Sequence, residues 1–161
     1  MKDAFAAEVA AQGEDPEVIE ILEEVCRVTG MGFVAVARVT EERWIACQVI
    51  DKIEFGLDPG DELEIKKTIC NDIRKSGHPI IIDHIGADPE WRTHPVPMLY
   101  GFESYASLPI VLDDGSFYGT LCAIDPEPRR LNAPELIATL KRYAEKVGRI
   151  LSAAVRAEAA D

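Results

Sequence analysis

The chain has 161 residues, of which 47% are hydrophobic and 29% are charged, the size and composition of one ordinary globular domain rather than of a disordered segment. Lys and Arg number 17 and Asp and Glu number 29, so the formal net charge is −12. Such a surface repels phosphate backbones and anionic lipid headgroups, so we expect neither nucleic acid nor a membrane as a partner. The first residues lack a signal-peptide pattern and no apolar run is long enough to span a bilayer, so the expected location is cytoplasmic.

The four cysteines are spread along the chain, at Cys26, Cys47, Cys70 and Cys122. No two of them form a C-x-x-C pair, so the spacing fits neither a disulfide framework nor a structural zinc site. Unpaired cysteines are among the most buried residue types. The sequence therefore predicts buried free thiols.

The first strong helix signal begins at Asp15, which precedes Pro16 and Glu17. An acidic capping residue, a proline at the first helical position and an acid in the first turn all favour a helix start. Gly30 and Gly32 mark its end. Apolar residues recur at three- and four-residue spacing between these signals, at Val18, Ile21, Leu22, Val25 and Cys26.

Two segments rich in valine, isoleucine and aromatic residues, 33–39 and 44–50, follow this helix and are separated by a polar break. They predict a β-hairpin. Further along, Asp61 with Glu64 three residues later resembles a capping box. This pattern predicts a helix over 62–76, ended by the glycine and proline that follow.

The second half of the chain begins with a short apolar strand over 79–83 and continues with an irregular loop over 84–103. A second hairpin follows, with strands over 104–112 and 116–124 joined by the turn 113–115. The Asp-Gly in this turn supplies the backbone conformations that a tight turn requires. The last strand carries apolar residues on both of its faces, so both faces of the sheet need a cover.

The chain ends in a long helix that residues 132–135 cap. The apolar residues of this helix recur at a near-heptad spacing. We expect the part of this stripe up to about Tyr143 to pack on the sheet. Beyond that point the stripe outruns a domain of this size, and we expect parallel pairing with a second copy. The residues predicted to form this homodimer helix are Tyr143, Val147, Ile150, Leu151 and Ala154.

The order of elements, together with four short segments, resembles the GAF domain family as found in sensor histidine kinases and phytochrome-like signalling proteins. The segments are Thr68–Asn71, Gly77–Asp83, Ser107–Ile110 and Gly119–Asp125. The resemblance covers roughly residues 16–155. It implies an α/β (α+β) fold in which an antiparallel sheet of about six strands has the terminal helices on one face, and a short helix with loops forms a cleft on the other. We expect one domain over 1–161, with a core at about 16–143 and helical extensions at both ends.

The resemblance also implies a function, because GAF domains sense or relay signals. We expect a domain that binds a small molecule, or relays a signal through its terminal helices to an output kinase or cyclase domain. Two alternatives from other classes stay open: a ligand-free dimerisation module, and a free methionine sulfoxide reductase that acts through clustered cysteines. The sequence has no recognisable catalytic motif, so the domain by itself is not expected to be an enzyme.

The expected ligand site is the cleft between the predicted helix 62–76 and the irregular loop. The side chains that we place in it are Cys70, Ile73, Asp83, Trp91, His94, Met98, Tyr100, Phe102, Tyr105 and Cys122. In the alternative interpretation, the aromatic residues among them fill the space and complete the core.

No ligand or cofactor is specified by these residues. Phytochrome-like GAF domains that hold a bilin through this region place a cysteine there, whereas the corresponding segment 91–95 contains none, so no covalent bilin is expected. The segment 94–98 loosely resembles the stretch that carries the proximal histidine of haem-binding GAF domains, which leaves haem or a noncovalent bilin as options. His78 and His84 lack the spacing and the carboxylates of a metal site.

Overall fold

The computed structural model describes residues 3–64, 69–93 and 101–160. An antiparallel sheet forms its centre, and its six strands lie in the order β3-β2-β1-β6-β5-β4. The strands are β1 (Phe33–Val39), β2 (Trp44–Asp51), β3 (Glu62–Leu63), β4 (Ile80–Ile82), β5 (Ser104–Val111) and β6 (Phe117–Asp125). This arrangement confirms the predicted fold class and both predicted hairpins.

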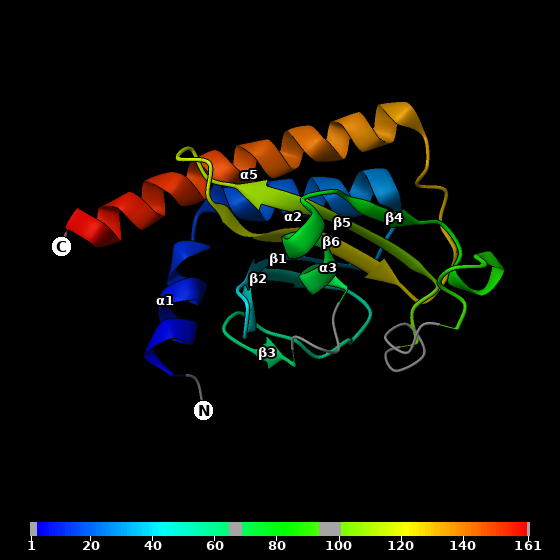
Figure 1. Ribbon diagram of the computed structural model, residues 1–161, viewed down its shortest axis with the longest axis horizontal. Helices are drawn as coiled ribbons and strands as arrows, with labels where there is room; N and C mark the ends of the chain where they lie inside the picture. Colours follow the sequence, from blue (N-terminus) through cyan, green and yellow to red (C-terminus); the bar gives the residue numbers. More distant parts are fainter. Residues whose placement is uncertain (1–2, 65–68, 94–100, 161) are drawn as a thin grey trace.

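In the described residues, four α-helices and a short 3₁₀ helix surround the sheet (Figure 1). They are α1 (Ala4–Gln12), α2 (Pro16–Thr29), α3 (Cys70–Ser76), the 3₁₀ turn η2 (Ile85–Ala87) and α5 (Pro134–Ala160). Helix α2 begins as the sequence predicts, because the Asp15 carboxylate accepts a hydrogen bond from the Glu17 backbone N–H at 2.8 Å. It ends at Gly30, whose φ of 73° is the left-handed conformation that favours glycine.

The helix predicted over 62–76 is wrong at its start, and residues 65–68 of it lie outside the described residues. The described part of that helix begins at Cys70, and Glu62–Leu63 is instead a strand that pairs with β2. The Asp61 carboxylate does not cap a helix, because it accepts a hydrogen bond from the Asp58 N–H at 2.8 Å and so closes a turn that precedes it. The Asp61 carbonyl also accepts a bond from the Ala46 N–H at 2.8 Å, which ties this segment to the sheet.

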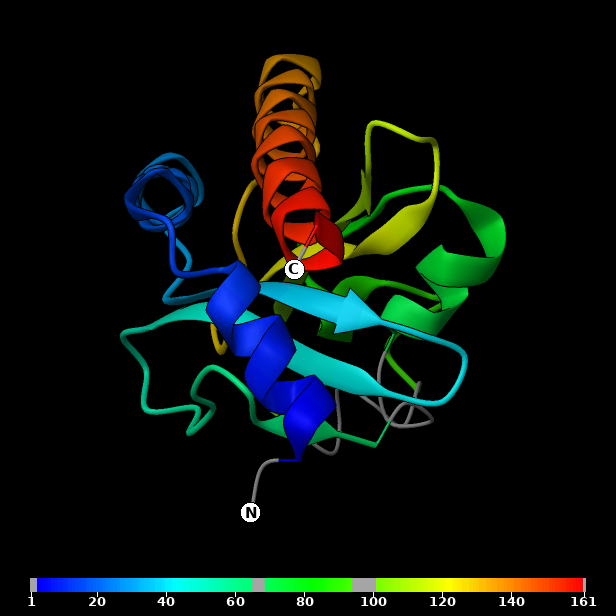
Figure 2. The same cartoon turned by 90° about the vertical axis from the view of Figure 1, so that its left-hand side faces the viewer.

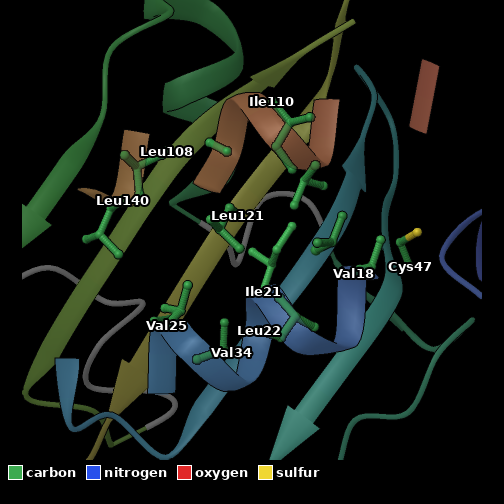
Figure 3. Close-up of a cluster of buried hydrophobic side chains, with 14 of the residues drawn as sticks. Val18, Ile21, Leu22, Val25, Val34, Cys47, Leu108, Ile110, Leu121 and Leu140 are labelled. Atoms are coloured by element: carbon green, nitrogen blue, oxygen red, sulfur yellow. The ribbon is translucent and has the colours of Figure 1, made fainter. Parts of the chain in front are cut away.

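The helices divide between the two faces of the sheet. Helices α2 and α5 lie side by side on one face, whereas α3 lies on the other (Figures 1 and 2). The first core lies beneath α2 and α5 (Figure 3) and includes Val18, Leu22, Val34, Leu108, Ile110, Leu121 and Leu140. The second core lies beneath α3 and includes Phe33, Ala35, Trp44, Ile73, Phe102, Tyr105 and Cys122. The two-sided cover that the sequence requires is therefore present.

Helix α5 lies against the sheet for more of its length than the sequence suggested. Val147 and Leu151 are 0% exposed in the first core, which corrects the prediction that they face a second copy. Gly148 explains the close packing, since a β-carbon at this position would lie 2.5 Å from the Val111 carbonyl oxygen. The other predicted dimer residues, Tyr143, Ile150 and Ala154, are half-buried. Within the described residues, no helix has both the length and the apolar content needed to cross a bilayer.

The contact between α5 and β5 predicts an unusual result for Gly148→Ala. In an open helix this change adds stability, about 1 kcal/mol. Here the new β-carbon would collide with the Val111 carbonyl, so we expect the free energy of unfolding to fall by about 1–3 kcal/mol in urea denaturation. Ala153→Gly, at an exposed position of the same helix, reports the propensity effect alone. A Gly148→Ala protein more stable than the original would contradict the close packing.

Candidate functional site

The first residue of α3, Cys70, points its thiol at a group of polar side chains on the sheet. Its Sγ accepts a hydrogen bond from the Thr120 hydroxyl at 3.2 Å, and it lies 3.5 Å from Tyr105 Oη and 3.8 Å from Ser107 Oγ. The Cys122 thiol lies close enough for the two thiols to shift each other's pKa. We call these five residues the polar cluster. All five are buried.

Strand geometry explains how the polar cluster assembles. Tyr105 and Ser107 are two residues apart on β5, and Thr120 and Cys122 are two residues apart on β6, so each pair shares one face of its strand. Ser107 is the register partner of Cys122, which places the two pairs side by side. The cluster is therefore built by two neighbouring strands and closed from above by α3.

The hydrogen bonds in the cluster make its two thiols unequal. The neighbouring Cys122 thiol lowers the pKa of the Cys70 thiol, burial opposes this, and bonds from Thr120 and Tyr105 lower the pKa further. The pKa of Cys122 is raised by the neighbouring Cys70 thiol and by burial. Burial likewise raises the pKa of the Tyr105 hydroxyl. Of the two thiols, Cys70 is the one poised to accept hydrogen bonds.

Trp44 belongs to the same core and has the one feature that its packing does not explain. Its buried indole Nε1 makes no hydrogen bond of normal length and angle among the described residues, and the weak interaction that it has with the Cys70 thiol helps to lower the pKa of that thiol. A buried donor without a partner costs about 1–3 kcal/mol. Next to the polar cluster, it is a donor available to an acceptor that enters from outside.

The structure brings together five of the predicted cleft residues, which are Cys70, Ile73, Phe102, Tyr105 and Cys122. Phe102 and Tyr105 stack with their ring centroids 5.5 Å apart, and Trp91 packs half-buried against the same core. These aromatic side chains fill space, as the alternative interpretation expected. The predicted residues His94, Met98 and Tyr100 lie outside the described residues.

Asp83 does not lie with the other predicted cleft residues, and its placement there is corrected. Its Oδ1 accepts hydrogen bonds from the backbone N–H of Leu131 and of Asn132, both at 3.0 Å, and from the Asn132 side-chain amide at 2.9 Å. The Asp83 carbonyl also accepts a bond from the Arg129 N–H at 3.0 Å. This carboxylate therefore ties the end of β4 to the segment that leads into α5.

Sequence reasoning missed Trp44, Ser107 and Thr120. A signal for two of them was available, because the predicted hairpin and its two-residue alternation place Ser107 beside Tyr105 and Thr120 beside Cys122 on one face. Nothing local in the sequence indicated Trp44. Trp44 lies on β2 and Cys70 begins α3, and only the tertiary fold brings these two residues together in the second core.

The remaining histidines do not form a metal centre. His84 Nε2 lies 3.7 Å from Glu103 Oε1 at the surface. In residues 3–64, 69–93 and 101–160, no three histidine, cysteine, aspartate or glutamate side chains come close enough to hold an ion.

Comparison with known proteins identifies the family. The family model described as GAF domain matches residues 17–151, which is most of the chain. The chain belongs to the GAF domain family. A search of curated proteins found no significant match to this GAF domain.

Solved structures share its fold at low sequence identity. The blue-light-absorbing form of the PixJ GAF domain from Thermosynechococcus elongatus is 12% identical, with a TM-score of 0.68 over 96% of this chain and 90% of that one. GAF-B of DevS from Mycobacterium smegmatis is 15% identical, with a TM-score of 0.65 over 91% and 100%. The type II free methionine-R-sulfoxide reductase from Thermoplasma acidophilum is 10% identical, with a TM-score of 0.63 over 91% and 94%. These likenesses establish the fold and leave the ligand open.

The polar cluster predicts a specific effect of Thr120→Val. The change keeps the shape of the side chain and removes the hydroxyl that donates to Cys70 Sγ. We expect the pKa of Cys70 to rise and the free energy of unfolding to fall by about 1 kcal/mol. Ultraviolet thiolate absorbance measured against pH reports the first quantity, and urea denaturation reports the second.

Thr139→Val is the matched control, because this hydroxyl bonds the Glu135 carbonyl at the exposed surface of α5. It should leave the thiol titration unchanged. An identical titration in Thr120→Val and the original protein would contradict the proposed hydrogen bonding.

Proposed function

We propose that this GAF domain is a sensory module in which the polar cluster and Trp44 receive a small molecule, and α5 passes the response to an output domain or a partner. The observation that carries the proposal is the buried Trp44 N–H, which makes no hydrogen bond of normal length and angle in the described part of the chain and has only a weak interaction with the Cys70 thiol of the cluster. If Trp44 had only a packing role, an apolar atom in place of this buried N–H would stabilise the folded protein.

The chemistry of the cluster favours a ligand that accepts hydrogen bonds. The hydroxyls of Tyr105, Ser107 and Thr120 can each donate, and although they now lie against Cys70 Sγ, an entering acceptor would compete with this sulfur for them and for the indole N–H of Trp44. Carbonyl, carboxylate or ring nitrogen atoms of a small metabolite would complement them. Haem and a noncovalent bilin stay as alternatives, and the absence of a cysteine in 91–95 counts against a covalent bilin.

Two connections support a relay from the α3 face to α5. Strand β5 presents Tyr105 and Ser107 to the α3 face, and its alternating residues Ala106, Leu108 and Ile110 pack in the core beneath α5. Strand β4 follows α3 directly, and at its end Asp83 holds the segment that enters α5. A change in the position of α3 therefore has a short route, through either strand, to the terminal helix.

The same reasoning favours regulation over catalysis. Cys70 and Cys122 are buried, so neither thiol is presented to a substrate as a reductase of methionine sulfoxide would need. We propose that the domain is not an enzyme, and that it works in the cytoplasm, as a homodimer, beside an output domain such as a histidine kinase or a cyclase. A ligand-free dimerisation module is the second candidate, favoured by the stacked Phe102 and Tyr105 that fill the core.

Trp44→Phe separates these two candidates. The change removes the indole N–H together with part of the buried ring, so we expect a small cavity and a fall of about 1–2 kcal/mol in the free energy of unfolding. Native mass spectrometry and absorption spectra of the protein purified from its own cells should show a bound small molecule in the original and at least about tenfold less in the variant, equivalent to ~1.4 kcal/mol.

Thermal-shift measurements with cyclic nucleotides, biliverdin, haemin and free methionine sulfoxide then test which of these compounds binds. Val39→Leu, a volume change elsewhere in the same core, is the control for altered packing. A protein that carries no extra mass and shifts with none of these compounds would support the ligand-free module instead.

A further inference from the structure

The four cysteines divide between the two faces of the sheet. Cys26 and Cys47 lie in the first core, whereas Cys70 and Cys122 lie in the second core, beneath α3. All four thiols are free and buried, and the sheet separates one pair from the other. Cys47 is engaged within its own core, where its Sγ donates a hydrogen bond to the Val9 carbonyl at 3.2 Å. The α3 face therefore holds one pair of thiols that can meet only each other.

The positions of Cys70 and Cys122 bring their sulfur atoms together. Cys70 Sγ lies 3.2 Å from Thr120 Oγ1 and 3.8 Å from Ser107 Oγ. Thr120 precedes Cys122 by two residues on the same face of β6. Ser107 is the register partner of Cys122, so the β-carbons of these two residues are about 4.5–5.5 Å apart. The Cys70 sulfur therefore lies over the part of the sheet from which the Cys122 side chain projects.

The two thiols differ in the way that the oxidation of a dithiol requires. One sulfur reacts first, as a thiolate, and the other then attacks it. The Cys122 thiol lowers the pKa of Cys70, burial opposes this, and the Thr120 hydroxyl lowers the pKa further. The Cys70 thiol and burial raise the pKa of Cys122. Cys70 is therefore the sulfur that reacts first, and Cys122 is the one that follows.

We propose that Cys70 and Cys122 form an oxidation site, at which hydrogen peroxide converts the two thiols to a disulfide that joins the start of α3 to β6. The Cys70 thiolate attacks one oxygen of the peroxide: an S–O bond forms, the O–O bond breaks, and the leaving hydroxide takes up the proton that Cys70 lost and becomes water. The Cys122 sulfur then attacks the Cys70 sulfur: the S–S bond forms, the S–O bond breaks, and the hydroxyl leaves as a second water with the Cys122 proton. The two sulfurs together lose the electron pair that the peroxide gains.

The α3 face can admit peroxide although both thiols are buried. Cys70 is the first residue of the seven-residue α3, and the residue before it, Ile69, makes no side-chain capping hydrogen bond. So short a helix has little stability of its own, and it opens locally at a small cost in free energy. Hydrogen peroxide is little larger than water, so it needs a much smaller opening than methionine sulfoxide does. The burial that argues against a reductase therefore does not argue against this reaction.

Oxidation changes the polar cluster and α3 together. An S–S bond of about 2.05 Å is much shorter than the contact between two separate sulfur atoms, so the bond draws Cys70 toward β6. A disulfide sulfur carries no charge and is a weak acceptor, so the Thr120 hydroxyl loses the thiol to which it donates. The inference goes beyond the proposed function, because it gives the domain a covalent input that does not depend on a bound small molecule.

Thiol mapping of the full chain tests the site. The reduced protein is treated with hydrogen peroxide at neutral pH, the remaining thiols are alkylated in denaturant, and the peptides are analysed by mass spectrometry without reduction. We expect the peptides that contain Cys70 and Cys122 to be joined within one chain, and dithiothreitol to separate them. Cys26 and Cys47 should remain reduced, and so be alkylated, at the same peroxide concentration. This measurement identifies the bond in the original protein, so it does not depend on the folding of any variant.

Three variants assign the roles of the thiols. In Cys122→Ala, Cys70 should still be oxidised, but it should stop at the sulfenic acid, which dimedone labels. In Cys70→Ala, Cys122 should remain a thiol. Cys26→Ala is the matched control, because Cys26 and Cys122 are both 6% exposed and Cys26 lies on the other face of the sheet. This control should form the disulfide at the rate of the original protein.

The inference is overturned if all four thiols survive a peroxide concentration that fully oxidises free cysteine. A disulfide of any other pair, or one between two chains, would also overturn it. So would sulfinic acid at Cys70 with Cys122 left as a thiol. Native mass spectrometry of the reduced protein reports separately on a bound small molecule, so failure of this inference and failure of the sensory proposal give different results.

Discussion

The sheet is apolar on both faces, and this constraint determines the rest of the architecture. Strands β1, β5 and β6 alternate their side chains between two cores, so neither face is left to water. One face is closed by the long amphipathic helices α2 and α5. Among the described residues, the other is covered by the seven-residue α3, by η2 and by connecting loops. The unequal covers give the two faces different roles: the helical face is a stable platform, and the α3 face holds the buried polar groups.

The polar cluster shows how a buried face is adapted for binding. Hydroxyls and thiols in a core are tolerated because they bond to one another, which costs less than leaving them unpaired. Trp44 is the exception, because its buried N–H has only a weak interaction with Cys70 and makes no hydrogen bond of normal geometry in the described residues. The same core contains three small residues, Ala35, Ala37 and Ala46, whose side chains take up little space between the sheet and α3. Membership of the GAF family explains the fold, whereas these residues define what this particular chain offers to a ligand.

Local patterns were sufficient to predict α2, both hairpins and the family resemblance, because their signals lie within a few residues of each other. Asp15 with Pro16, and Asp114 with Gly115, are such signals. The errors arose where the decisive partner is distant. Asp83 bonds to residues 48 and 49 positions further along the chain, and Asp61 joins a turn and a strand instead of a helix. Val147 and Leu151 are buried because Gly148 admits the β5 backbone, which a heptad pattern does not reveal.

The central claim is that the α3 face and α5 are mechanically coupled, with Asp83 as the link between β4 and the start of the helix. Hydrogen exchange of the α5 backbone amides in Asp83→Ala tests it most directly. The account predicts faster exchange in the first turns of α5 and also in α3, with α2 unchanged, because the hydrogen bonds from Leu131 and Asn132 are lost. Faster exchange confined to residues 131–133, with α3 and the rest of α5 unchanged, would contradict the coupling.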